Sequence, residues 1–202
     1  MTDLFADVSC PYAHLGIRRF VQRRRTAGRR DLLLHVRAWP LELVNGEPLD
    51  AEHVAAVVAD LRVQVAPDLF TGFDPQVFPT TTLPALELVD DSYRAGRWAG
   101  ERASLAVRDA LFEHGQDIGD PDVLTRIRRE LHLGNPHPDA RARVLADWRE
   151  GRRRGVIGSP HFFVNDHSFF CPALRIERGD GLRRIQMDTT RFDDFFEECL
   201  AA

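Results

Sequence analysis

The N-terminal part of the chain carries the pattern that most constrains the fold: an apolar run, a sharp turn, an amphipathic stretch and a second apolar run. Residues 4–8 form the first run, and residues 11–25 place their apolar side chains largely on one helical side. Residues 32–39 form the second run, which ends at Pro40. A strand, a helix and a strand in this order predict a βαβ unit, so an α/β fold is expected.

The middle of the chain has helical periodicity with several breaks. We expect a helix over residues 51–61 and a long helical run over residues 85–115 with one or two kinks. Two further helices are predicted, one capped by Asp120 and one that begins at Pro138 and ends at Gly155. Residues 67–84, with repeated Pro, Gly and Thr, predict a loop. This part is therefore predicted to be an all-helical insertion.

The C-terminal part returns to strand periodicity. Residues 159–164 and 168–171 are short and aromatic, and the turn 165–167 between them predicts a hairpin. A further strand is predicted over residues 174–177, followed by a final helix that Thr189 or Thr190 caps. The predicted order is βαβ, helical insertion, ββα.

Cys10 lies where the first strand turns into the first helix. The N–H groups of a first helical turn have no partners within the helix, and they stabilise a thiolate relative to a thiol. Pro11 suits the first helical position because it has no N–H to leave unpaired. We therefore expect Cys10 to be a functional thiol with a lowered pKa, and a buried structural cysteine is the alternative. The fourth position of this Cys-x-x-x segment is Ala13, so any second sulfur must come from elsewhere.

Composition excludes several classes of function. The chain has only three cysteines, and an odd, small number does not fit a disulfide framework, so reduced thiols are expected. The formal net charge of −4 argues against a nucleic-acid binder, and the absence of lysine excludes Schiff-base chemistry. The cysteines and histidines have no zinc-type spacing, so no metal is expected. The sequence also has no apolar run long enough to span a membrane and no signal-peptide pattern, so we expect a cytoplasmic protein.

Three segments together resemble one group of proteins. Residues 7–16, Asp-Val-Ser-Cys-Pro-Tyr-Ala-His-Leu-Gly, are similar to the active-site segment of FrnE-like DsbA proteins, 2-hydroxychromene-2-carboxylate isomerases and kappa-class glutathione transferases. Residues 155–162 resemble the segment that carries the group's cis-proline, and residues 111–118 with Val123 and Leu124 resemble one of its helix-and-turn patterns. The resemblance implies a thioredoxin fold with the large helical insertion of the DsbA superfamily. Residues 1–48 and 156–202 would form the thioredoxin-like domain, and residues 49–155 the helical insertion domain.

The chain departs from both branches of this group in the active-site segment. The dithiol oxidoreductases keep a second cysteine where this chain has Ala13, and the transferases and isomerases usually have serine where it has Cys10. A single cysteine can attack a disulfide, but position 13 offers no thiol to release the mixed disulfide. We therefore expect a monothiol, DsbA-like thiol–disulfide oxidoreductase. Two alternatives stay open: a kappa-class-like transferase or 2-hydroxychromene-2-carboxylate-type isomerase, and a non-catalytic thioredoxin-like binding module.

The resemblance also implies roles for residues near Cys10. Pro11 and Tyr12 would shape the start of the helix, and a cis bond between Ser159 and Pro160 would direct backbone groups of Ser159 toward the sulfur. These groups could hold a thiol ligand or substrate by strand-like hydrogen bonds.

Two further side chains have an open assignment. His14 would either lie over the thiol, assisting its ionisation or acting as a general acid, or be a solvated polar residue. Cys171 lies across the predicted hairpin from about His161, so it is the candidate second thiol, with a core position as the alternative. We expect no tightly bound cofactor. Glutathione or mycothiol would instead resolve the mixed disulfide, and the sequence leaves a homodimer open.

Overall fold

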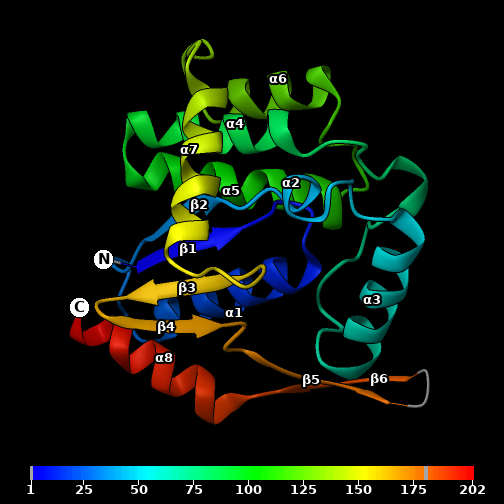
Figure 1. Ribbon diagram of the computed structural model, residues 1–202, viewed down its shortest axis with the longest axis vertical. Helices are drawn as coiled ribbons and strands as arrows, with labels where there is room; N and C mark the ends of the chain where they lie inside the picture. Colours follow the sequence, from blue (N-terminus) through cyan, green and yellow to red (C-terminus); the bar gives the residue numbers. More distant parts are fainter. Residues whose placement is uncertain (1, 180–181) are drawn as a thin grey trace.

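A four-stranded mixed sheet of order β2-β1-β3-β4 forms the centre of the molecule (Figure 1). The computed structural model describes residues 2–179 and 182–202. The strands are β1 (Thr2–Ala6), β2 (Leu34–Ala38), β3 (His161–Val164) and β4 (His167–Phe170). β1 runs parallel to β2 and antiparallel to β3, and β3 runs antiparallel to β4. The predicted α/β class and the βαβ unit are confirmed.

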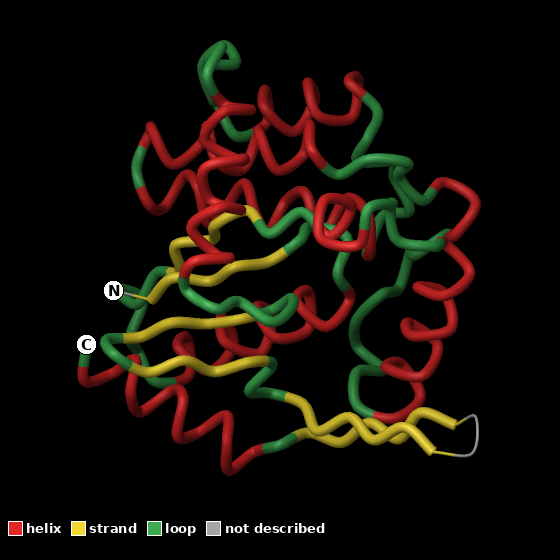
Figure 2. Tube along the Cα trace, viewed as in Figure 1, coloured by secondary structure: helices red, strands yellow, loops and turns green. Residues whose placement is uncertain are grey.

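Helices cover this sheet and form most of the chain between β2 and β3 (Figure 2). They are α1 (Pro11–Thr26), α2 (Leu41–Asn45), α3 (Ala51–Gln64), α4 (Leu83–Ser92), α5 (Arg97–Phe112), α6 (Pro121–Glu130), α7 (Ala140–Arg153) and α8 (Thr189–Ala201), with short 3-10 helices at Pro75–Val77 and Tyr93–Ala95. α1 and α8 lie against one face of the sheet, where Phe20 and Phe195 pack on each other and Phe162 of β3 packs on Phe195. Within the described residues, no helix combines the length and the apolar character that a bilayer span requires.

The two faces of the sheet carry two hydrophobic clusters, because successive side chains of a strand point to opposite sides. Leu4 belongs to the large cluster on the α1 side, whereas Phe5 belongs to a small one with Trp39 and Val156. α7 covers the second face at close range, because a Cβ atom at Gly151 would lie 2.7 Å from the Trp39 ring. The helical insertion thus supplies one layer of the sheet's cover, and the domain boundaries at residues 48/49 and 155/156 stay a prediction.

A buried ion pair fixes the C-terminal end of α1. Arg24 and Glu101 form two hydrogen bonds of 2.6 and 2.5 Å, and both side chains are almost completely buried. Glu101 also accepts a hydrogen bond from the backbone N–H of Leu34 at 2.9 Å, which links α1, α5 and β2. Removal of one partner from such a pair leaves an uncompensated buried charge, at a cost of about 3–5 kcal/mol. α1 is therefore held firmly against the sheet.

Several predicted bounds differ from the structure. β1 ends at Ala6 rather than residue 8, because the chain turns there and the Asp7 side chain accepts a hydrogen bond from Leu41 N of α2. The run predicted over residues 85–115 is two helices, α4 and α5, because Gly96 has a left-handed φ of +114° that ends the helical path. The final helix is capped by Asp188, whose side chain accepts from Arg191 N, and not by Thr189 or Thr190.

The C-terminal strands also differ in detail. β4 begins at His167, so the hairpin turn has two residues, and Cys171 lies just beyond the strand. β5 (Leu174–Gly179) pairs with β6 (Leu182–Met187) in a separate two-stranded ribbon. The sequence pattern does not indicate β6, because Arg183 and Arg184 interrupt its apolar residues. Nor does it indicate α2, which is too short for a periodic signal.

Candidate active site

Cys10 is the N-cap residue of α1 and is almost completely buried, with 4% of its surface exposed. Its thiol donates a hydrogen bond to the carbonyl oxygen of Ser159, with Sγ and O separated by 3.1 Å. The Ser159–Pro160 peptide bond is cis, and the Pro160 ring packs against α1 at Gly16. The start of α1 and the segment before β3, which are distant in the sequence, therefore meet at one sulfur atom.

The expected lowering of the Cys10 pKa is wrong. Burial raises the pKa of the Cys10 thiol above its ordinary value near 9.0, and the charge of Asp7 acts in the same direction. Hydrogen bonding to the Ser159 side chain and to the backbone N–H groups of Ala13 and Tyr12 opposes this rise but does not outweigh it. The N–H groups of the helix start do face the sulfur, as the sequence predicts. The resting side chain is nevertheless a neutral thiol, because desolvation penalises a buried thiolate more than these donors stabilise it.

Asp7 lies beneath this site and is completely buried. Its carboxylate accepts two hydrogen bonds from Ser9, from N and Oγ at 2.8 Å each. It accepts two more from Leu41 N at 2.7 Å and Thr82 Oγ1 at 3.1 Å. Burial nevertheless raises the pKa of Asp7 against these four bonds. Asp7 N also donates to Ser159 Oγ at 3.0 Å, so Asp7 positions the segment that contacts the thiol.

Arg108 of α5 is a second buried charged group at this site. Its guanidinium donates to the carbonyl oxygen of Asp7 at 3.0 Å and to the carbonyl oxygen and hydroxyl of Ser104 at 3.1 and 2.6 Å. Burial lowers the pKa of Arg108 to about 10, although the charges of Asp7 and Cys10 oppose this change. A cation thus compensates the acidic groups below the thiol. Arg108 is a positioning residue, because it holds the turn that leads from β1 into Cys10.

His14 is buried and faces Glu113, which follows the end of α5. Its Nε2 atom is hydrogen bonded to Glu113 Oε1 at 2.7 Å, and its ring packs against Phe70 and Phe112. Burial lowers the pKa of His14, so the ring is neutral and donates from Nε2. The Nδ1 atom carries no proton in this tautomer, and it has no hydrogen-bond partner among the described residues. His14 therefore fastens α1 to the end of α5, and it is not the solvated residue that the sequence left open. A role of His14 at the thiol stays a prediction.

The other predicted residues gather around the sulfur. Pro11 is buried at the first position of α1, and Tyr12 is half-buried against the main core. Cys171 is also buried, and its N–H donates to the Pro160 carbonyl oxygen at 3.0 Å. Its predicted place opposite about His161 is off by one residue, because His161 pairs with Phe170. Cys10, Cys171 and Cys199 are all free thiols.

Asp7, Arg108 and Glu113 belong to the site although the sequence motifs predict no role for them. One signal for Arg108 was available, because Glu101, Ser104 and Arg108 recur at helical spacing beside the apolar face of α5. A polar stripe at the edge of a buried face predicts internal partners. Asp7 and Glu113 carry no such pattern, since most of their partners, Leu41 and Thr82 for Asp7 and His14, Phe70 and Thr71 for Glu113, are distant in the sequence.

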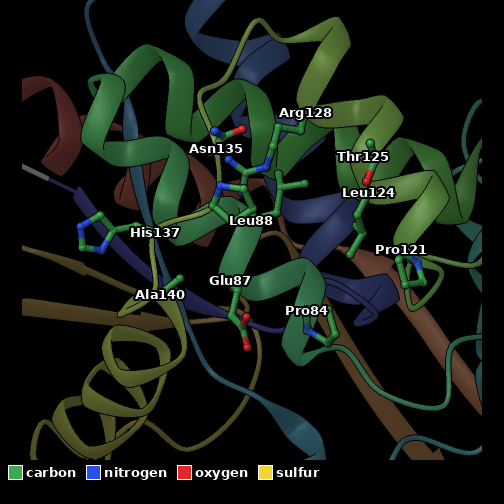
Figure 3. Close-up of a pocket in the computed structure, with 11 residues that line it drawn as sticks. Pro84, Glu87, Leu88, Pro121, Leu124, Thr125, Arg128, Asn135, His137 and Ala140 are labelled. Atoms are coloured by element: carbon green, nitrogen blue, oxygen red, sulfur yellow. The ribbon is translucent and has the colours of Figure 1, made fainter.

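A cavity of about 350 Å³ lies elsewhere, in the helical insertion (Figure 3). Arg128, Asn135 and His137 line it together with apolar residues of α4 and α6. Arg128 is already bonded to Asp91 Oδ2 at 3.1 Å and to the Gly134 carbonyl oxygen at 2.6 Å. The residues that line this cavity include no cysteine, so the cavity is separate from the thiol site.

The family follows from a comparison that covers most of the chain. A family model of the DSBA-like thioredoxin domain matches residues 1–180. The chain belongs to this family. This DSBA-like protein therefore has the thioredoxin fold that its active-site segment and element order predicted. None of the curated proteins matches the sequence.

Solved structures with the same fold include enzymes of two kinds. The cytosolic disulfide reductase DsbM from Pseudomonas aeruginosa is 13% identical, with a TM-score of 0.60 over 100% of this chain and 99% of that chain. DsbM with GSH is 17% identical, with a TM-score of 0.57 and the same coverage. A 2-hydroxychromene-2-carboxylate isomerase is 14% identical, with a TM-score of 0.60 over 84% of this chain and 87% of that chain. At these identities the likeness to the DSBA-like protein establishes the fold.

Proposed function

We propose that this DSBA-like protein is a thiol–disulfide oxidoreductase in which Cys10 is the attacking thiol. The observation that carries the proposal is the position of Cys10 Sγ at the start of α1, 3.1 Å from the carbonyl oxygen of Ser159 and beside cis-Pro160. An incoming disulfide that displaces the contact with Ser159 leaves the sulfur facing the N–H groups of Tyr12 and Ala13. These donors then stabilise the thiolate at the moment of attack.

The reaction consists of two thiol–disulfide exchanges. The Cys10 thiolate attacks one sulfur of a disulfide, forms a mixed disulfide and releases the other sulfur as a thiolate. A low-molecular-weight thiol such as glutathione or mycothiol, as its thiolate, then attacks the mixed disulfide and returns Cys10. Each exchange breaks one S–S bond and forms one. The external thiol supplies the electrons and the external disulfide receives them, so no tightly bound cofactor is needed.

The raised pKa of Cys10 favours the reducing direction. A strong oxidant in this superfamily stabilises its reduced form as a thiolate, which makes the sulfur a good leaving group. Burial and the charge of Asp7 oppose the thiolate here. We therefore infer that the protein reduces low-molecular-weight or protein disulfides, which fits a cytoplasmic location.

A second candidate function also rests on the neutral thiol. Cys10 donates a hydrogen bond, as a serine hydroxyl does, so it could hold a bound thiol cofactor of a kappa-class-like transferase or a 2-hydroxychromene-2-carboxylate-type isomerase. In that case Cys10→Ser keeps the activity, because the hydroxyl replaces the donor. Under the first proposal the same change abolishes disulfide reduction, because no sulfur remains to attack.

One experiment distinguishes the two candidate functions. Reduced wild-type protein, Cys10→Ser and the control Cys199→Ser are incubated with oxidised glutathione or mycothiol disulfide across pH 6–10, about the range of thiol ionisation. Adducts are followed by intact mass and peptide mapping. We expect an adduct on Cys10 in the wild type and the control, with a rate that rises with pH. Modification of a reference thiol but not of Cys10 would overturn the proposal, and conjugation or isomerisation retained by Cys10→Ser would establish the second function.

A further inference from the structure

The two cysteines that contact the Ser159–Pro160 segment belong to the hydrophobic cluster on the α1 side of the sheet. Phe162 and Phe169 pair across β3 and β4 and both pack on Phe195 of α8. Neighbouring side chains alternate, and His161 accordingly stacks on Phe163 on the opposite face. Cys171 lies opposite Pro160 through the hydrogen bond from its N–H to the Pro160 carbonyl oxygen, and it packs in the same large cluster as Phe162. α1 covers this cluster, and Cys10, the N-cap residue of α1, belongs to it.

Backbone contacts tie both cysteines to adjacent residues. The Cys10 thiol donates to the Ser159 carbonyl oxygen at 3.1 Å, and Cys171 N donates to the next carbonyl oxygen, that of Pro160, at 3.0 Å. Both side chains belong to the same hydrophobic cluster. Burial raises the pKa of Cys171 to about 12, and a thiolate at Cys10 acts in the same direction. The two thiols are therefore close enough to influence each other.

Cys171 also lies where the backbone leaves the ladder. It follows the last residue of β4, its φ is +47°, and its carbonyl oxygen accepts from Leu174 N at 3.2 Å in a turn. No strand hydrogen bonds beyond the single one to Pro160 have to break for this residue to move. Cys199 differs in place, because its sulfur accepts from Thr2 Oγ1 at 3.6 Å, at the opposite end of β1 from the site.

We propose that Cys171 is the resolving cysteine that the active-site segment lacks at Ala13. The inference rests on the proposed oxidoreductase function. Cys10 attacks an external disulfide RSSR, forms Cys10–S–S–R and releases RS⁻. The Cys171 thiol then gives its proton to the released RS⁻, and its sulfur attacks the Cys10 sulfur, forms a Cys10–Cys171 disulfide and releases the second RS⁻, which takes up the proton that Cys10 lost. The two cysteines together lose two electrons, which reduce RSSR to two thiols, and two external thiols later restore the dithiol.

The test compares the lifetime of the mixed disulfide in matched variants. Reduced wild type, Cys171→Ser, Cys171→Ala and the control Cys199→Ser are exposed to oxidised glutathione, quenched with acid at intervals and analysed by intact mass. Tryptic peptides 1–18, 155–175 and 192–202 carry the three cysteines separately, so mapping identifies any disulfide. We expect the wild type and Cys199→Ser to pass through a Cys10 adduct to a disulfide between peptides 1–18 and 155–175. Both Cys171 variants should keep the glutathione on Cys10 at least about tenfold longer.

The resolving role and the proposed function are refuted by different results. Equal adduct lifetimes in wild type and both Cys171 variants, with no linked peptides, would refute the resolving role and leave the monothiol reaction standing. Absence of any Cys10 adduct and of any Cys10–Cys171 disulfide, while a reference thiol reacts, would refute the proposed function and the resolving role together. Thermal unfolding of each variant checks that the fold is retained, and the alanine variant excludes an effect of the serine hydroxyl.

Discussion

Asp7 and Glu113 are two carboxylates that flank the start of α1, and they accept the same number of hydrogen bonds with opposite results. Asp7 accepts four, from Ser9, Leu41 and Thr82. Glu113 also accepts four, from His14, Phe70 and Thr71. The pKa of Asp7 is raised, whereas the pKa of Glu113 is lowered to about 2.

Depth of burial explains the difference. Asp7 is 0% exposed, and desolvation outweighs its donors. Burial also acts to raise the pKa of Glu113, but its side chain keeps 13% exposure and the hydrogen bonds prevail. Equal hydrogen bonding therefore does not imply equal ionisation, because the penalty for a buried charge grows with loss of water. The carboxylate beneath the thiol is the costly one, and it raises the pKa of Cys10.

The largest expected effect comes from removal of the cation that compensates Asp7. Arg108→Met keeps much of the side-chain volume but leaves the buried acidic group without a countercharge and the Asp7 carbonyl oxygen without its donor. We expect a loss of about 3–5 kcal/mol in the free energy of unfolding, measured by chemical denaturation. Arg102→Met, at an exposed position of the same helix, should change it by less than about 0.5 kcal/mol. Equal effects of the two changes would show that Asp7 needs no compensation.

Glu113→Gln should have an intermediate effect with a defined pH dependence. A depressed folded-state pKa stabilises the protein above the unfolded value of about 4.5, and this stabilisation is lost as the pH falls toward about 2. We expect the wild type to exceed the variant by about 1–3 kcal/mol at pH 7 and the difference to shrink below about pH 4.5. Denaturation curves across this range measure it, with exposed Glu130→Gln as the control. A difference that is constant with pH would contradict an ionised Glu113 that accepts hydrogen bonds from His14, Phe70 and Thr71.

Asp7→Asn should give the smallest net change and the opposite slope. Loss of acceptor capacity costs about 1–2 kcal/mol, but the buried charge disappears with it. Because the folded-state pKa of Asp7 is raised above 3.8, the folded protein holds its proton longer than the unfolded chain, and the wild type loses stability as the pH rises above 3.8. The variant should therefore gain on the wild type with rising pH, in the same denaturation series. A slope of the same sign as that of Glu113→Gln would refute the assignment.

Much of the architecture follows from patterns that local sequence carries. The βαβ unit, the caps at Asp50 and Asp120 and the aromatic hairpin depend on periodicity and on residues close in the chain. The bounds of β1 and β4 do not, because a strand ends where its last partner ends. The separate β5–β6 ribbon is also a tertiary feature, since Gln64 of α3 accepts a hydrogen bond from Ile185 N and so holds β6 in place.

The candidate site divides in the same way. Local sequence determined that Cys10 begins a helix, that Pro11 follows it at the first helical position and that the N–H groups of the first turn face the sulfur, because all of this depends on adjacent residues. Only the tertiary structure decided that the thiol is neutral, that His14 faces Glu113 and that Arg108 lies beneath the turn. A pKa depends on desolvation and on charges within a few ångströms, and here those groups come from α5, from the loop before α4 and from the segment that ends in cis-Pro160.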